Sequence, residues 1–378
     1  MIVNRNHGLD TLRAVAIILV FMFHCFLRTN IHTEPEVINQ AGWAGVDLFF
    51  VLSGYLIGNQ IFASFLNNHS FSLKTFYLRR WLRTLPNYVF VLGLYFLIPV
   101  FRDQPFITPL WKFLTFTQNF GLQLSSYSQA WSLCIEEQFY LFLPLIAIGI
   151  VYKGNIRTGW FLVSFIIVGG IILRSALWFA YIPHAGTNIY QIYLSKIYYP
   201  TFCRLDGLTL GVAIAMLKSF HKTAWSHVIR QGHWLMILGL LGCYLTFYPL
   251  EQLYGLNATA LSYFFRSLSF AALVLAALSP KTLLHRVKVP GATTLATLAY
   301  AIYLTHLQLM SITQRVLFHW HIDGASAFTV IMEMLVCFAG SWILYTCVEL
   351  PFLKLRENLG KETVSDLPRL QPKLESGA

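Results

Sequence analysis

The sequence has little charge and a large share of apolar residues. Only 11% of its 378 residues are charged, 56% are hydrophobic, and the mean hydropathy is +0.59. Soluble globular domains carry about 25% charged residues, so this composition excludes an ordinary soluble domain. The apolar residues lie in long runs, and a run of about 20 such residues can cross a bilayer as a helix. The sequence therefore predicts a polytopic membrane protein.

Three further patterns are missing from the chain. The six cysteines form no C-x-x-C pair and show no metal-ligand spacing, so we expect neither a disulfide framework nor a metal site. The sequence shows no internal repeat, whereas secondary transporters are commonly built from two repeated halves. The first apolar run is not followed by a small-x-small cleavage site, so we expect it to remain as a transmembrane helix.

Ten apolar windows predict transmembrane helices. We expect an all-α bundle over residues 1–355, followed by a polar and disordered cytoplasmic tail over residues 356–378. The sixth window is the weakest, because it is short and opens with Arg204 and Asp206. The expected spans are residues 9–27, 45–66, 84–101, 131–151, 159–179, 203–217, 233–249, 258–278, 293–311 and 328–349.

The basic residues predict the orientation of the bundle. With the N-terminus inside, the cytoplasmic segments hold sixteen Lys and Arg residues and the outer segments hold six. Short cytoplasmic loops of membrane proteins carry an excess of Lys and Arg, so this bias predicts that both termini lie inside. The net charge of +11 then reflects topology and contact with anionic lipid rather than binding to nucleic acid.

Arg13 and His24 lie in the first predicted helix with ten apolar residues between them. Eleven steps of about 100° bring both side chains to one face of the helix, and a rise of about 1.5 Å per residue separates them by about 16 Å. Ionisable groups cost about 2 to 3 kcal/mol or more at a bilayer centre, so this stripe indicates a polar path inside the bundle. The alternative is a snorkelling arginine and a histidine that is bonded to a neighbouring helix.

Other polar side chains are predicted at the depth of His24, in the outer halves of three further helices. They are Asp47, Glu136, Glu137, Tyr303 and His306. Adjacent residues of a helix point in directions that differ by about 100°. We therefore expect at most one of the two glutamates to contact His24.

Three arginines lie at the cytoplasmic entrance of the third predicted span. Within FYLRRWLRTLPNY, Arg80 and Arg83 lie one helical turn apart, and Arg79 precedes them. Guanidinium groups suit bidentate binding of phosphate. Because Arg13 projects from the same side, the sequence predicts a site for a polyanionic ligand that enters from the cytoplasm. The simpler alternative is that these residues only follow the positive-inside rule.

Seven ordered motifs give the chain a family resemblance. They are GLDTLRAVAIILVFMFH with its arginine-to-histidine spacing, GVDLFFVLSGYLIG, the R-x-x-R of Arg80 to Arg83, WSLCIEEQFYLFLP, DGLTLGVAIA, LAYAIYLTHLQL and VELPF. From Gly8 to about Leu353 the chain resembles the acyltransferase-3 family of bacterial integral membrane acyltransferases. That family includes O-antigen, peptidoglycan and exopolysaccharide O-acetyltransferases.

The resemblance implies a membrane O-acyltransferase of the bacterial inner membrane. An acyl group, most commonly acetyl, would move from cytoplasmic acyl-CoA to a hydroxyl of a carbohydrate or glycolipid acceptor at the outer face. Acetyl-CoA is then a co-substrate, and no bound cofactor is expected. A polytopic transporter or flippase that uses Arg13, His24 and Glu136 or Glu137 along a polar path is the alternative function.

The resemblance also implies roles for individual residues. Arg13 and His24 match the essential pair of the family, Arg80 and Arg83 match the motif implicated in acyl-CoA handling, and Asp47, Glu136, Glu137 and Glu349 match family acidic positions. Taking this together with the depth of the side chains, we expect Arg13, Arg80 and Arg83 to bind acyl-CoA, His24, Asp47, Glu136 and Glu137 to be catalytic, and Tyr303, His306 and Asp206 to bind substrate.

Two routes of transfer remain open. In the first, neutral His24 takes the proton of the acceptor hydroxyl, which contributes about 10² to 10⁴ in rate, and Glu136 or Glu137 orients the ring. In the second, His24 is acylated first and then passes the group on. The sequence does not identify the acceptor, the acyl length or the oligomeric state.

Overall fold

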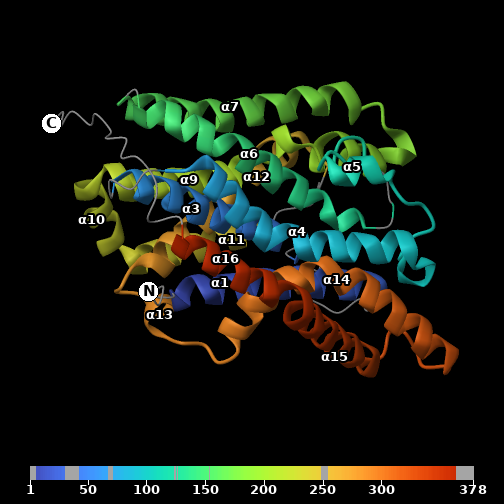
Figure 1. Ribbon diagram of the computed structural model, residues 1–378. Coiled ribbons are helices and arrows are strands. Elements are labelled where there is room, and N and C mark those ends of the chain that lie inside the picture. The colour runs from blue at the N-terminus through green and yellow to red at the C-terminus, as the bar shows by residue number, and fades with distance from the viewer. Residues whose placement is uncertain are drawn as a thin grey trace.

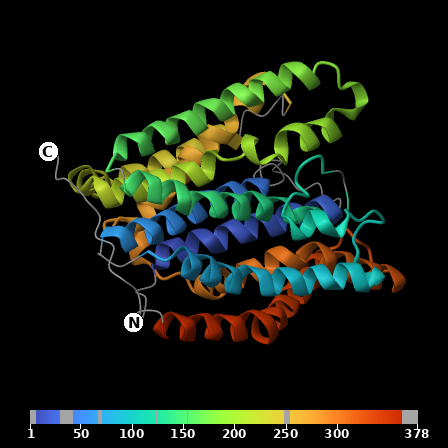
Figure 2. The same cartoon turned by 45° about the horizontal axis from the view of Figure 1, so that its top comes forward.

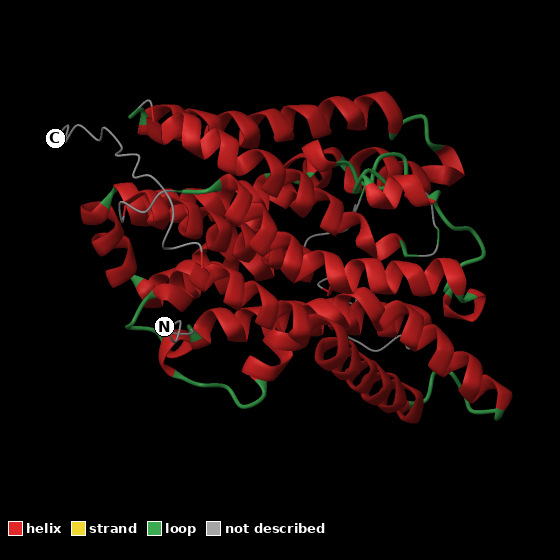
Figure 3. Cartoon of the chain, in the orientation of Figure 1, coloured by secondary structure: helices red, strands yellow, loops and turns green. Residues whose placement is uncertain are grey.

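The computed structural model describes residues 6–29, 42–66, 71–122, 125, 127–152, 154–247 and 254–362. Within these ranges the regular structure is helical and no strand is present (Figure 3). The longer helices are α1 (His7–Thr29), α3 (Gly45–Leu66), α4 (Leu73–Leu97), α6 (Trp131–Tyr152), α7 (Ile156–Tyr181), α9 (Asp206–Phe220), α11 (Gly232–Phe247), α12 (Leu256–Leu278), α14 (Ala292–His319), α15 (Ala327–Leu344) and α16 (Leu350–Glu362). The expected all-α bundle is confirmed.

Short elements connect these helices. The short α-helices are α5 (Leu110–Leu114), α8 (Ile189–Tyr193), α10 (Lys222–Arg230) and α13 (Leu283–Arg286). Single 3-10 turns are η1 (Gly42–Ala44), η2 (Pro99–Phe101), η3 (Ser128–Ala130), η4 (Gly186–Asn188) and η6 (Thr201–Cys203), and π-helical turns are η5 (Leu194–Tyr198) and η7 (Tyr345–Glu349).

Each of the ten predicted spans overlaps a helix, but fewer helices meet the length and hydropathy of a membrane span. Among the described residues, seven helices do so, or up to eight if α10 and α11, which meet at 72°, form one span. Charged residues lower the hydropathy of the first half of α4, and α9 has only 15 residues. The chain is a multi-pass membrane protein, and the number of spans stays a prediction.

The polar C-terminal segment begins as a helix. α16 continues to Glu362, so the first residues of the tail expected over residues 356–378 are helical. Residues 363–378 lie outside the described residues.

The long helices lie side by side, and α1 lies in the interior of the bundle (Figure 1). It packs against α3, α12 and α14. Figure 2 shows α7 and α16 on opposite faces. α7 exposes Phe161, Phe165 and Ile172 by more than 60% each, as expected of a helix that faces lipid. The helix that carries Arg13 and His24 is therefore packed against three neighbours, and it exposes Val15 and Ile18 on its remaining face.

Two glycines bring α3 and α9 into close contact. A Cβ atom at Gly54 would lie 2.1 Å from the carbonyl oxygen of Leu208, and one at Gly211 would lie 2.3 Å from that of Val51. Small residues permit such close approach of membrane helices. The contact holds the N-terminal halves of α3 and α9 beside each other.

Candidate functional site

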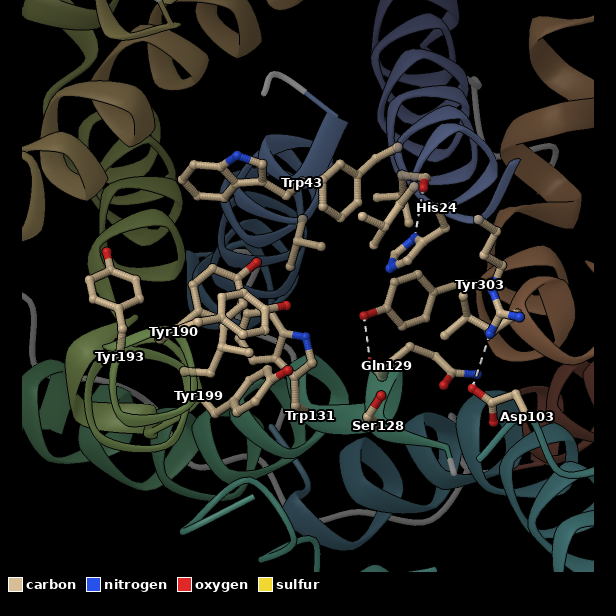
Figure 4. A pocket seen from close by; sticks show the side chains of 18 of the residues that line it. His24, Trp43, Asp103, Ser128, Gln129, Trp131, Tyr190, Tyr193, Tyr199 and Tyr303 are labelled. Atoms are coloured by element: carbon tan, nitrogen blue, oxygen red, sulfur yellow. Dashed lines mark hydrogen bonds and ion pairs between the residues drawn. The ribbon is translucent and has the colours of Figure 1, made fainter. Parts of the chain in front are cut away.

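A cavity of about 390 Å³ lies beside the C-terminal half of α1, and we call it the His24 cavity (Figure 4). α1, α3, α8, α14 and the segment that leads into α6 contribute to its walls. Its polar and aromatic lining includes His24, Arg28, Trp43, Asp103, Gln104, Ser128, Gln129, Trp131, Tyr190, Tyr193, Tyr198, Tyr199, Tyr254, Tyr263 and Tyr303.

His24 directs one ring nitrogen into this cavity. Its Nδ1 atom lies 2.8 Å from the carbonyl oxygen of Val20. A carbonyl oxygen only accepts hydrogen bonds, so Nδ1 carries a proton, and in the neutral ring Nε2 then keeps its lone pair. No described residue bonds to Nε2, and Figure 4 shows the ring pointing into the cavity. In a neutral ring, this geometry directs the lone pair of Nε2 into the His24 cavity.

His306 lies behind His24 and is completely buried. Its Nδ1 atom lies 2.9 Å from the carbonyl oxygen of Tyr303 and 3.1 Å from that of Ile302, so this nitrogen donates. Its Nε2 atom is then an acceptor, and it lies 3.2 Å from Nδ1 of His24. The Nδ1 proton of His24 thus faces two neutral acceptors, Val20 and His306. His306 does not line the cavity, so the structure gives it contact with His24 rather than with a ligand.

The wall opposite His24 is aromatic. Trp131 packs against Tyr198 and Tyr199, with ring centroids 4.8 Å and 5.5 Å apart. Tyr193 and Tyr199 lie between α7 and α9, outside the candidate spans, and burial raises the pKa of both hydroxyls. They remain neutral, and the hydroxyl of Tyr193 is hydrogen bonded to that of Tyr263. Such a surface offers flat apolar faces together with hydroxyl groups.

A charged pair completes the cavity. Arg28, one turn after His24, lies 3.3 Å from a carboxylate oxygen of Asp103, which follows η2. This pair closes the wall between α1 and the loop after α4. No sequence pattern indicated Asp103, because it lies in a loop and its partner comes from a helix 75 residues earlier.

A second cavity of about 550 Å³ lies beside the first half of α1, and we call it the Arg13 cavity. Its charged lining consists of Arg13, Arg79, Arg80, Arg83, Arg356, Glu136, Glu137 and Glu349. Five arginines against three glutamates give this lining a net charge of +2. The structure therefore brings together the arginines that the sequence predicted for a polyanion.

The two predicted catalytic glutamates lie in the Arg13 cavity rather than against His24. Arg80 approaches Glu136 at 3.6 Å and Glu137 at 3.9 Å, and its guanidinium lies 3.8 Å from the ring centroid of Tyr140. Tyr140 also donates to Glu136. The expected orientation of the His24 ring by a glutamate is not seen, because these carboxylates are held by α4 and α6 side chains.

Glu349 lies in the π-helical turn η7 and accepts a hydrogen bond of 2.7 Å from Asn87. π-helical turns within α-helices are frequent at functional sites, because the extra residue redirects a side chain. Here the turn directs a buried carboxylate into the lining of the Arg13 cavity.

Asp47 and Asp206 lie in buried ion pairs away from both cavity linings. Asp47 accepts from Arg204 at 2.6 Å and from Arg266 at 3.2 Å. Asp206 accepts two bonds from Arg174, at 2.7 Å and 3.1 Å. The two aspartates are therefore bound to arginines rather than directed into a cavity. The sequence predicted a catalytic role for Asp47 and a substrate-binding role for Asp206. Breaking a buried pair leaves an uncompensated charge, which is costly.

The two cavities meet at Tyr303. Among the described residues, only Val46 and Tyr303 line both cavities. The helix rise between Arg13 and His24, about 16 Å, therefore runs from one cavity to the other past these two side chains. In the part of the chain that the structure describes, no group of three or more His, Cys, Asp or Glu residues forms a metal site.

Comparison with known proteins identifies the family. The sequence model of a family described as an acyltransferase domain, the acyltransferase-3 family, matches residues 6–346. This match confirms the resemblance drawn from the ordered motifs, and it confirms the expected acyltransferase at the level of the family. No solved structure matches the chain significantly.

Curated relatives carry related names. The chain is 26% identical over 367 residues to peptidoglycan O-acetyltransferase OatA of Listeria monocytogenes, which covers 92% of this chain and 56% of that protein. It is 28% identical over 228 residues to O-acetyltransferase OatA of Staphylococcus aureus, which covers 56% of this chain and 34% of that protein. The chain thus spans only one third to about one half of the length of these relatives.

Proposed function

Since the chain belongs to the acyltransferase-3 family, we propose that it is a membrane O-acetyltransferase. It takes an acetyl group from acetyl-CoA in the Arg13 cavity and transfers it to a hydroxyl of a carbohydrate or glycolipid in the His24 cavity. The observation that carries this proposal is the meeting of an arginine-lined cavity and a histidine-lined cavity at Tyr303. The name of the Listeria relative, a peptidoglycan O-acetyltransferase, supports a carbohydrate acceptor.

The charge of the Arg13 cavity supports a CoA thioester as the donor. The nucleotide end of CoA carries several phosphate charges, and arginine binds phosphate oxygens in bidentate geometry. Arg83 and Arg13 line the cavity together with Arg80. Arg80 is balanced in part by Glu136 and Glu137, and Arg13 lies 4.0 Å from a carboxylate oxygen of Asp10. The slender pantetheine arm then extends toward Tyr303. Its length suits the rise of about 16 Å that separates Arg13 from His24.

The lining of the His24 cavity supports a sugar as the acceptor. Trp131, Tyr198 and Tyr199 offer aromatic faces for the apolar side of a sugar ring. Arg28, Asp103 and nearby polar groups can hydrogen bond to its hydroxyls. A ligand that combines apolar faces with many hydroxyl groups matches both features.

The transfer step uses Nε2 of His24. This nitrogen takes the proton of an acceptor hydroxyl while the hydroxyl oxygen attacks the thioester carbonyl carbon. The new C–O bond forms as the C–S bond breaks, and CoA leaves as a thiolate into the Arg13 cavity. During the step His24 is an imidazolium whose Nδ1–H stays bonded to Val20 and faces His306. The proton then passes from Nε2 to solvent or to the thiolate.

The proposed sidedness follows the distribution of basic residues. The sixteen-to-six bias supports a cytoplasmic Arg13 cavity and a His24 cavity that faces the outside. Acetyl-CoA is made in the cytoplasm, and envelope glycans lie outside it, so the two substrates would reach opposite ends of the bundle. We propose that the membrane is the bacterial inner membrane.

A thiol-release assay tests the proposed function. The full chain in lipid nanodiscs receives acetyl-CoA with or without soluble peptidoglycan fragments, and free CoA thiol and fragment mass are measured. We expect thiol release that depends on the fragments, together with fragments heavier by one acetyl group. Absence of both products with peptidoglycan fragments, and also with a mixture of bacterial envelope glycans, would contradict the proposal.

A further inference from the structure

The ring of Tyr303 separates the two cavities. Its side chain is 7% exposed, and Val46, which shares this position, is 6% exposed. Both side chains line the His24 cavity on one side and the Arg13 cavity on the other. A thioester in the Arg13 cavity is therefore screened from Nε2 of His24 while Tyr303 holds this position.

Two hydrogen bonds hold the ring of Tyr303 in place. Its hydroxyl lies 2.7 Å from the carbonyl oxygen of Gln129, which can only accept, so the hydroxyl proton points there. Ser132 lies 2.5 Å from the same hydroxyl and must then be the donor. Gln129 lines the His24 cavity, whereas Ser132 lines the Arg13 cavity. The hydroxyl of Tyr303 is thus fixed at the boundary by one residue from each side.

The side chain of Gln129 adds a further connection. Its amide nitrogen donates to the carbonyl oxygen of Leu304, the residue that follows Tyr303 on α14. The segment before α6 is therefore joined to α14 at the hydroxyl of Tyr303 and at the backbone of the next residue. A change that releases the ring must break contacts between these two elements rather than rotate one free side chain.

Water is the competing acceptor in such a site. Water in the His24 cavity can give its proton to Nε2 of His24 and attack the thioester carbonyl carbon. The C–S bond breaks, and the products are acetate and CoA thiol, with no acetylated glycan. A boundary that keeps the thioester away from this water suppresses the loss. We propose that Tyr303 determines the choice between a bound acceptor hydroxyl and water, an inference that rests on the proposed function.

Acceptor-free thiol release tests this inference directly. In nanodiscs with acetyl-CoA and no glycan, Tyr303→Ala is expected to raise the release of thiol and acetate at least tenfold over the wild-type chain. Tyr303→Phe keeps the ring and loses only the two hydroxyl bonds, so its increase should be smaller. Adding His24→Ala to Tyr303→Ala should remove the increase, because the water then has no base.

Two outcomes would overturn the inference. One is a folded Tyr303→Ala chain whose acceptor-free release equals that of the wild type. The other is an increase that persists when His24→Ala is added, which would mean that water reaches the thioester without the help of this base. Failure of the proposed function shows separately, as a wild-type chain that releases no thiol when glycan is supplied.

A second variant keeps the test decisive if Tyr303→Ala does not fold. Val46→Ala removes two methyl groups from the same boundary and leaves the hydrogen bonds of Tyr303 intact. We expect a smaller rise in acceptor-free release that also depends on His24. Leu335→Ala, an exposed position on α15 that lines neither cavity, is the matched control for losing an apolar side chain. A Val46→Ala chain that behaves as this control would count against the inference.

Discussion

Nε2 of His306 lies 3.2 Å from Nδ1 of His24, although 282 positions separate the two residues in the chain. In serine hydrolases a buried carboxylate holds the catalytic histidine and stabilises the imidazolium. Here the described neighbours of Nδ1 are a carbonyl oxygen and a second imidazole, both neutral. They fix the tautomer of His24 without adding a negative charge. A neutral ring with its lone pair on Nε2 is the form that a general base requires.

Removal of the base is the first prediction. His24→Ala should lower the rate of glycan-dependent thiol release by about 10² to 10⁴, the usual contribution of a general base. Binding of CoA should change little, because His24 does not line the Arg13 cavity. The measurement pairs the transfer rate with equilibrium binding of CoA. Unchanged transfer in a folded His24→Ala chain would remove this residue from the mechanism.

His306 is predicted to act as a positioning residue. His306→Ala removes an acceptor that faces the Nδ1 proton, and a hydrogen bond to a group that becomes charged contributes about 1.5 to 3 kcal/mol. We expect kcat to fall about tenfold to a hundredfold while KM for acetyl-CoA stays the same. His306→Gln keeps an acceptor oxygen and should recover part of kcat. A change in KM for the glycan alone would instead indicate contact with substrate.

The sequence predicted the helices better than the partners of their polar residues. Hydropathy located ten helices, because each membrane span needs a long apolar run. The position of each residue along its span predicted that His24 and His306 lie at a similar depth in the membrane. Depth in the membrane does not say, however, which neighbouring helix a side chain faces. The neighbour of Glu136 depends on how α6 is rotated and on which helix packs beside it, and that helix supplies Arg80.

Buried ion pairs were hidden from the sequence for a similar reason. Arg266 lies in the middle of α12, outside every motif, and it meets Asp47 across 219 residues. An arginine inside a membrane span costs free energy, so its presence in the sequence indicates a buried counter-charge. It does not identify the residue that supplies that charge. The same limit applies to the aromatic wall, because tyrosines and tryptophans also gather at membrane interfaces.

The Arg13 cavity gives a prediction about donor affinity. Arg83→Gln removes one guanidinium from the lining and should weaken CoA binding about tenfold or more, since charge-assisted hydrogen bonds contribute about 1.5 to 3 kcal/mol. Arg157→Gln is the matched control, because Arg157 is exposed and lines neither cavity. Equal CoA affinity in both variants would show that Arg83 does not bind the donor.

Asp47 is predicted to matter for stability. Asp47→Asn leaves the buried guanidiniums of Arg204 and Arg266 without their carboxylate. Breaking such a buried pair costs about 3 to 5 kcal/mol, so the thermal unfolding midpoint in detergent should fall clearly. Asp323→Asn, at an exposed loop position, is the control. An Asp47→Asn chain that has normal thermal stability but transfers no acetyl group would instead indicate a catalytic role for Asp47.

A direct measurement can distinguish the one-step transfer route from the two-step route. If His24 acts as a general base, the acetyl group moves in one step, and both substrates must be bound together. If His24 is acylated first, its Nε2 forms a bond to the acetyl carbon, and CoA thiol leaves before any glycan arrives. Both routes use the same lone pair, because Nδ1 is held by Val20.

The position of Tyr303 favours the one-step route, since the boundary would have to open without an acceptor for acyl-His24 to form. We therefore expect no burst of CoA thiol from nanodiscs given acetyl-CoA alone, and no acetylated His24 peptide by mass spectrometry after rapid quenching. A burst equal to the amount of protein, with the acetyl group on His24, would establish the two-step route instead.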